Sequence, residues 1–145
     1  MCSKTVLKAH LEKIPPTAEH GTQFYKFLFT QVPDARGFFA GAKDIDPNKV
    51  PQSERFQKQG VRFLTKMHSL VDMCDDEKQL KETLSEMFVG HKKKYKIGES
   101  GPYELVGNQF LAFLENYIGA NDEQKENWQN FLKLMVQEAK CTLEQ

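Results

Sequence analysis

Residues 53–74 read SERFQKQGVRFLTKMHSLVDMC, and this long amphipathic segment indicates the fold class. Its apolar and small residues recur every three or four positions, which is the period of one face of an α-helix. Ser53 stands where an N-cap is expected, because its side chain can accept a hydrogen bond from a free backbone N–H group. The pattern predicts a helix over residues 53–73. Its apolar face comprises Phe56, Gly60, Phe63, Met67, Leu70 and Cys74.

The segments before it also have helical character. Residues 20–31 place four large side chains at i, i+4 spacing, and Pro33 ends that helix. These side chains are Phe24, Tyr25, Leu28 and Phe29. The N-terminal segment up to Ile14 predicts another helix, which the following pair of prolines stops. Residues 37–51 are dense in Gly, Asp and Pro, and they predict turns and irregular connections.

Three more helices are predicted after residue 76. The first has one apolar face, which carries Leu80, Leu84, Met87, Phe88 and His91. The second begins at Pro102 and ends at Gly119, and the third begins near Asn121, where Gln124 completes a capping box. Strand signals are weak throughout. The sequence therefore predicts an all-α domain.

The composition argues against several classes of function. The 20 basic and 20 acidic residues balance, whereas nucleic-acid-binding proteins carry a basic surplus. No run of about 18 apolar residues is present, so no membrane span is expected. The chain starts without the pattern of a secretory signal. Its three cysteines, with no Cys-x-x-Cys motif, favour free thiols in a reducing cytoplasm.

His91 is the most informative polar residue. It lies on the apolar face of its helix, three positions after Phe88. Spacing alone favours a core histidine with one hydrogen bond, and it leaves open a neutral imidazole that binds a metal. Asp44–Asn48 resembles the start of a calcium loop, but Lys49 and Arg55 stand where that loop needs Gly and Glu. No phosphate-binding loop or zinc set is present.

Several motifs, in the expected order, resemble those of globins, and of nematode globins in particular. They are FYKFLF (24–29), VPD (32–34) and GFF (37–39) of the B helix, C turn and CD corner, SERFQKQG (53–60) of the distal helix, FVGH (88–91) of the proximal helix, and PYELVG (102–107) of the G helix. Gly21 and Gly60 match small residues that let two helices cross closely. The resemblance covers about residues 20–140. It implies a globin fold of six to eight helices around a haem pocket, as one domain over residues 1–145.

The resemblance also implies a role for each matching residue. His91 corresponds to the proximal ligand of the haem iron, and Tyr25 and Gln59 correspond to distal residues that stabilise bound oxygen. The second ring nitrogen of His91 is expected to bond the backbone carbonyl of Met87, because Gly90 has no hydroxyl to offer. The residues expected to contact the cofactor are Phe39, Gln59, Arg62, Phe63, Met87, His91, Tyr95, Ile97 and Val106.

The function that the resemblance implies is reversible binding of O2 and other diatomic gases at haem b, without enzymatic activity, for storage or transport. Two hydrogen-bond donors at about 1.4 kcal/mol each predict high affinity, with oxygen release slowed about a hundredfold. A haem protein for redox work, such as nitric oxide dioxygenation or redox sensing, is an alternative, and a haem-free helical interaction module is another. The oligomeric state stays open, a homodimer included.

Overall fold

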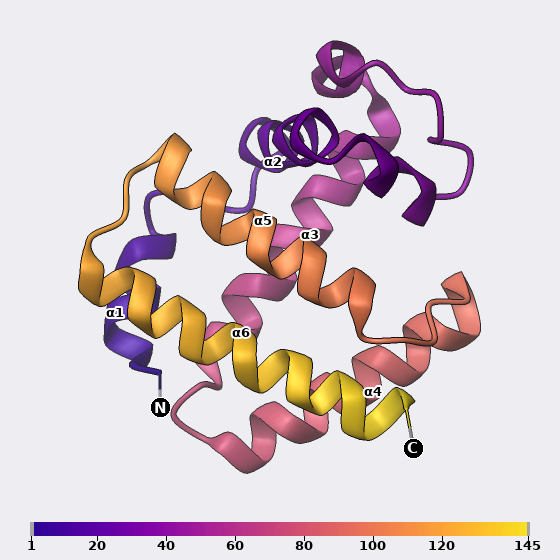
Figure 1. Cartoon of the computed structure of the whole chain (residues 1–145). Coiled ribbons are helices and arrows are strands. Elements are labelled where there is room, and N and C mark those ends of the chain that lie inside the picture. Colours follow the sequence, from indigo (N-terminus) through magenta and orange to yellow (C-terminus); the bar gives the residue numbers. More distant parts are fainter. Residues whose placement is uncertain (1, 145) are drawn as a thin grey trace.

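The computed structural model describes residues 2–144, so Met1 and Gln145, at the ends of the predicted domain, lie outside the described residues. Residues 2–144 form six α-helices and two short 3-10 helices and contain no strand (Figure 1). The all-α prediction and the expected range of six to eight helices are confirmed. In chain order the helices are α1 (Lys4–Leu11), α2 (Ala18–Gln31), η1 (Pro33–Phe38), η2 (Pro47–Gln52), α3 (Glu54–Asp72), α4 (Glu77–Tyr95), α5 (Gly101–Tyr117) and α6 (Asp122–Leu143).

Two helix starts follow the capping side chains that the sequence predicted. The hydroxyl of Ser53 accepts a hydrogen bond from the backbone N–H of Phe56 at the start of α3. At α6, the side chain of Asn121 accepts from the N–H of Gln124, and the side chain of Gln124 accepts from the N–H of Asn121. Such caps contribute about 1 kcal/mol each, because they satisfy N–H groups that the helix leaves unpaired.

Two segments differ from the sequence-based expectation. Residues 37–51, predicted to be irregular, contain the end of η1 and most of η2, which begin at Pro33 and Pro47. Proline suits the first helical position because its ring fixes φ and it has no N–H to satisfy. The N-terminal helix ends at Leu11, three residues before the expected end, although the side chain of Ile14 is still fully buried.

The close crossing of α2 and α3 depends on two glycines. A Cβ atom on Gly21 would lie 2.4 Å from the Cα of Gly60, and a Cβ on Gly60 would lie 2.7 Å from the Cα of Gly21. These separations are far below van der Waals contact, so a larger residue at either position would push the helices apart. The crossing predicted at these two positions is confirmed, and it brings the start of α3 against α2.

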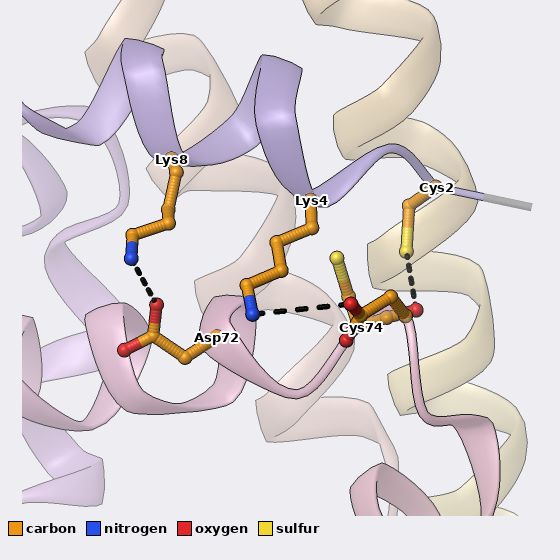
Figure 2. A network of polar contacts seen from close by, with 6 residues as sticks. Cys2, Lys4, Lys8, Asp72 and Cys74 are labelled. Carbon is orange, nitrogen blue, oxygen red and sulfur yellow. Dashed lines mark hydrogen bonds and ion pairs between the residues drawn. The ribbon is translucent and has the colours of Figure 1, made fainter.

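The N-terminal segment packs against the end of α3 and forms polar contacts with it (Figure 2). Two exposed ion pairs join them: Lys8–Asp72 at 3.0 Å and Lys4–Asp75 at 3.9 Å. The thiol of Cys2 lies 4.0 Å from the backbone carbonyl oxygen of Cys74, and both cysteines are buried. Exposed ion pairs contribute at most about 1 kcal/mol each, so burial of apolar side chains such as Leu7 carries most of this contact.

His10 is a core histidine in this fold. Its side chain is fully buried. Its Nδ1 accepts a hydrogen bond from Nε1 of Trp128 at 3.0 Å, and its Nε2 donates to the backbone carbonyl of Gly119 at 2.8 Å. Both ring nitrogens are therefore used inside the protein, which leaves none to bind a ligand.

Candidate functional site

Tyr25 of α2 lies inside a shell of aromatic rings, and its side chain is 2% exposed. Five ring centroids lie between 5.3 and 6.0 Å from its own, those of Phe24, Phe29, Phe39, Phe56 and Phe63. Burial raises the pKa of Tyr25 well above its ordinary value, while a hydrogen bond with Gln59 and the charge of Arg62 act in the opposite direction. The phenol therefore keeps its proton at neutral pH and can donate it in a hydrogen bond.

The three predicted site residues of α3 lie beside this phenol. Gln59 is half-buried, and its Oε1 accepts a hydrogen bond from Nη2 of the exposed Arg62 at 3.2 Å. This contact uses the carbonyl end of the amide, so the NH2 end is the part that can donate toward Tyr25. Phe63 is half-buried and stacks on Phe24, with ring centroids 4.7 Å apart and planes 8° apart.

His91 lies on α4 and is half-buried. Its Nδ1 is 3.0 Å from the hydroxyl oxygen of Tyr103, in the first turn of α5. Burial lowers the pKa of His91, and the positive charges of Lys66 and Lys94 lower it further, so the imidazole is neutral at pH 7. Within residues 2–144, Nε2 forms no hydrogen bond to a protein group, in contrast to Nε2 of the core histidine. His91 therefore presents one nitrogen to a ligand.

The partner of Nδ1 corrects one expectation. The carbonyl of Met87 was predicted to accept this hydrogen bond, and that prediction is wrong, because the hydroxyl of Tyr103 occupies the position. Burial raises the pKa of Tyr103 to about 12, so its hydroxyl also stays protonated. Sequence analysis missed Tyr103 because helical spacing says nothing across a loop. Its place directly after Pro102, the start of the predicted helix, was the only available signal.

Helix α4 packs against α3, and Lys66 of α3 lies close enough to His91 for its positive charge to lower the pKa of the imidazole. Tyr95 is 46% exposed, and its ring centroid lies 5.4 Å from that of His91. Tyr95 therefore lies beside His91, on the same helix.

The nine residues predicted to contact a cofactor share one property: none of them is fully buried. Arg62 and Tyr95 are exposed and the other seven are half-buried, whereas core rings such as Phe56 and Phe110 have lost almost all their accessible surface. The half-buried residues are Phe39, Gln59, Phe63, Met87, His91, Ile97 and Val106. Side chains with remaining accessible surface are available to line a ligand site.

Two other features, a cluster of metal ligands and a membrane span, are absent from the part of the chain that the structure describes. Residues 2–144 contain no group of three or more His, Cys, Asp or Glu side chains placed to hold a metal ion. Nor does any helix in this range have the length and apolar character needed to cross a lipid bilayer.

Comparison with known proteins identifies the family of this fold. The family model for globins matches residues 22–139. The chain belongs to the globin family. Membership implies haem, iron and oxygen binding, and the matched range lies within the residues 20–140 over which the sequence resembles globins.

Relatives of this globin include nematode proteins. It is 34% identical over 110 residues to a globin-like protein of Caenorhabditis elegans, covering 76% of this chain and 68% of the relative. It is 32% identical over 114 residues to a myoglobin of Nippostrongylus brasiliensis, covering 77% of this chain and 71% of the relative.

Solved structures agree on the fold of this globin. A high-resolution structure of a C. elegans globin-like protein superposes with a TM-score of 0.89 at 30% identity, over 97% of this chain and 91% of the other. Myoglobin from Aplysia limacina superposes with a TM-score of 0.83 over 97% of this chain and 98% of the other. Because its identity is 18%, this second match bears on the fold alone.

The side chains of this globin fit a haem group. A planar, apolar ring system with an iron centre and two carboxylate groups needs a neutral nitrogen ligand, apolar walls and cations at its edge. His91 supplies the nitrogen, since its Nδ1 is already engaged and its Nε2 is not. Phe39 and Phe63 supply half-buried apolar walls, and the exposed guanidinium of Arg62 supplies a cation near them.

Proposed function

We propose that this globin binds haem b through His91 and reversibly binds O2 and other diatomic gases, for storage or transport rather than catalysis. One combination of observations carries the proposal: α4 bears a neutral imidazole with one ring nitrogen that is not hydrogen-bonded within residues 2–144, and α2 bears a buried, protonated phenol. The first is suited to hold iron, and the second is suited to stabilise a polar gas ligand.

Each proposed contact follows from the type of side chain. Nε2 of His91 holds the iron, and Arg62 pairs with a propionate at the edge of the site. Tyr95 and Ile97 line the proximal edge, and the remaining walls are apolar. These walls are formed by Phe39, Phe63, Met87 and Val106. When bound, haem would supply an iron centre able to bind a diatomic gas, and His91 would hold that centre.

Tyr25 and Gln59 set the affinity for oxygen in this proposal. Both are donors on the side of the site opposite His91, and the aromatic shell around Tyr25 excludes water from the phenol. Hydrogen bonds in such a low-dielectric setting are stronger than in water. Two donors at about 1.4 kcal/mol each slow oxygen release about a hundredfold.

The cellular setting is part of the same proposal. We place this globin in the cytoplasm, as one domain over residues 1–145. Cys2, Cys74 and Cys141 are free thiols, and a reducing compartment keeps thiols in that state. The balanced charge supports a small gas as the binding partner rather than a nucleic acid.

An absorption spectrum tests the proposal. Recombinant protein mixed with haemin, reduced, and exposed to carbon monoxide is expected to show a Soret band that shifts with the gas. His91→Gly should lose haem on a desalting column and should regain it when free imidazole is added. His68→Gly is the matched control, because His68 is a helical histidine on α3 that bonds the carbonyl of Ile14.

Two outcomes would overturn the proposal. One is a wild-type protein that stays colourless after mixing with haemin. The other is a His91→Gly protein that keeps haem as well as the His68→Gly control does.

A slow rate of autoxidation in air, together with no turnover of nitric oxide beyond one equivalent, is expected for a storage or transport protein and argues against the redox alternative.

A further inference from the structure

We propose that Tyr103 is the residue that positions the proximal histidine: its hydroxyl oxygen accepts the hydrogen bond from Nδ1 of His91 and so fixes the tautomer and the orientation of the ring. This inference rests on the proposed function and goes beyond it. Neither the sequence pattern nor the family membership points to Tyr103, and the backbone carbonyl predicted for this role does not perform it.

The geometry of the pair supports a directed hydrogen bond. Nδ1 of His91 and the hydroxyl oxygen of Tyr103 are 3.0 Å apart, within the range of a normal hydrogen bond. Their ring planes are 6° apart with centroids 6.0 Å apart, so the two rings are nearly parallel and offset. Parallel, offset rings let the hydroxyl reach the edge of the imidazole, where the N–H group lies.

Tyr103 itself is held in place from two sides. The ring of Phe88, one turn before His91 on α4, packs edge-on against it with centroids 4.6 Å apart. The start of α5 is tied to the end of α6, because the carboxylate of Glu144 accepts a hydrogen bond from the backbone N–H of Ser100 at 2.6 Å. Tyr103 therefore belongs to a fixed framework, and it can impose an orientation on the histidine.

The tautomer follows from the number of protons on a neutral imidazole. Such a ring carries one N–H and one lone pair, and a metal needs the lone pair. With the proton on Nδ1 donated to the Tyr103 oxygen, the lone pair is on Nε2, the nitrogen that points away from α5. A partner of this kind sets both the tautomer and the strength of a histidine ligand, and its loss typically weakens metal binding about 10- to 100-fold.

Tyr103→Phe tests the role because it removes one oxygen atom and keeps the ring that packs on Phe88. We expect haem to leave the variant about tenfold faster than the wild type, measured by transfer to an excess of a colourless apoglobin acceptor. The matched control is Tyr117→Phe, on the same helix. It removes the 2.9 Å hydrogen bond between the Tyr117 hydroxyl and Nδ1 of His20, at the other end of α5, and should leave haem loss unchanged.

A spectroscopic readout separates positioning from packing. The iron–histidine stretching band in the resonance Raman spectrum of the reduced protein should move to lower frequency in Tyr103→Phe, because Nδ1–H has lost its acceptor and the ligand becomes less basic. The same band should not move in Tyr117→Phe. A role in packing alone would leave the band in place in both variants.

A measurement on the wild-type protein covers the case in which Tyr103→Phe does not fold. In the reduced carbon monoxide form, the NMR signal of the Nδ1–H proton of His91 should be observable and should show a nuclear Overhauser effect to the ring protons of Tyr103. An Nδ1–H proton that shows no such effect would overturn the inference.

The two proposals fail in different ways. If the wild type takes up no haem, or if His91→Gly retains it, the proposed function fails and this inference fails with it. If the wild type holds haem through His91 while Tyr103→Phe has the wild-type rate of haem loss and an unmoved Raman band, the inference alone is overturned.

Discussion

Tyr25 and His91 acquire their chemistry from burial rather than from neighbours in the sequence. The phenol of Tyr25 loses contact with water inside five aromatic rings, which keeps it protonated. The imidazole of His91 is half-buried near two lysines, which keeps it unprotonated. Desolvation favours the neutral form of each group, so the phenol can donate a hydrogen bond and the imidazole keeps a lone pair.

Replacing Tyr25 by phenylalanine should accelerate the release of oxygen. The variant keeps the ring in its aromatic shell and removes the hydroxyl donor, which contributes about 1.4 kcal/mol, so the dissociation rate should rise about tenfold. Stopped-flow displacement of oxygen by carbon monoxide measures this rate. Tyr117→Phe should match the wild type, and an unchanged rate in Tyr25→Phe would remove this phenol from the mechanism.

The same tyrosine should make stability depend on pH in the alkaline range. The pKa of Tyr25 is raised in the folded protein, so above pH 10 the unfolded chain loses this proton while the folded protein keeps it. The folded state then binds more protons, and the free energy of unfolding falls as pH rises, by up to about 1.4 kcal/mol per pH unit for one such group. Urea unfolding at pH 9 and pH 11 measures the fall.

The control for this pH effect is the phenylalanine variant, which has no proton to lose at that position. Between pH 9 and pH 11 its stability should fall less than that of the wild type. Part of the fall should remain, because burial also raises the pKa of Tyr103. Equal falls in both proteins would contradict the raised pKa of Tyr25.

At the level of helices, the crossing of α2 and α3 determines which side chains can meet. Gly21 and Gly60 allow the two backbones to touch, and this brings Gln59 of α3 within reach of Tyr25 of α2. Periodicity in the sequence predicted both helices, and capping side chains predicted where α3 and α6 begin. The crossing itself was predicted only through the resemblance to globins, because no local pattern records the distance between two helices.

Gly60→Ala should lower the free energy of unfolding by about 1–3 kcal/mol, the usual cost of an overpacked core. The reason is that the new methyl group would meet the backbone of Gly21. Chemical denaturation of the haem-free protein measures this change. Gly90→Ala is the matched control, since a Cβ on that helical glycine meets nothing within 4 Å. It should stabilise the protein by up to about 1 kcal/mol. A Gly60→Ala protein as stable as the wild type would show that the helices can separate at little cost.

At the scale of the whole molecule, the reactivity of the buried cysteines depends on whether the chain is folded. Cys74, at the end of α3, is 4% exposed and lies beside Cys2 of the N-terminal segment (Figure 2). Burial raises the pKa of Cys74 to about 12, and the proximity of Cys2 adds to the shift. Cys141, by contrast, is exposed on α6.

Alkylation should therefore distinguish the two thiols. Because the thiolate is the reactive form, iodoacetamide at pH 8 is expected to modify Cys141 readily and Cys74 hardly at all in the folded protein. Mass spectrometry of peptides taken at intervals measures both rates. In urea the two rates should become similar. Equal rates in the absence of denaturant would mean that the contact between α1 and α3 opens freely.

The sequence by itself determined the helices of this globin and several of their ends, because periodicity and capping depend on residues at most four positions apart. It also marked His91 as unusual, but its spacing could not separate a ligand from a core histidine such as His10. Only the tertiary structure distinguished the two histidines: partners from distant parts of the chain occupy both nitrogens of His10, whereas Tyr103 occupies one nitrogen of His91. Such contacts join residues that packing brings together, and the local pattern of the chain does not record which distant residues become partners.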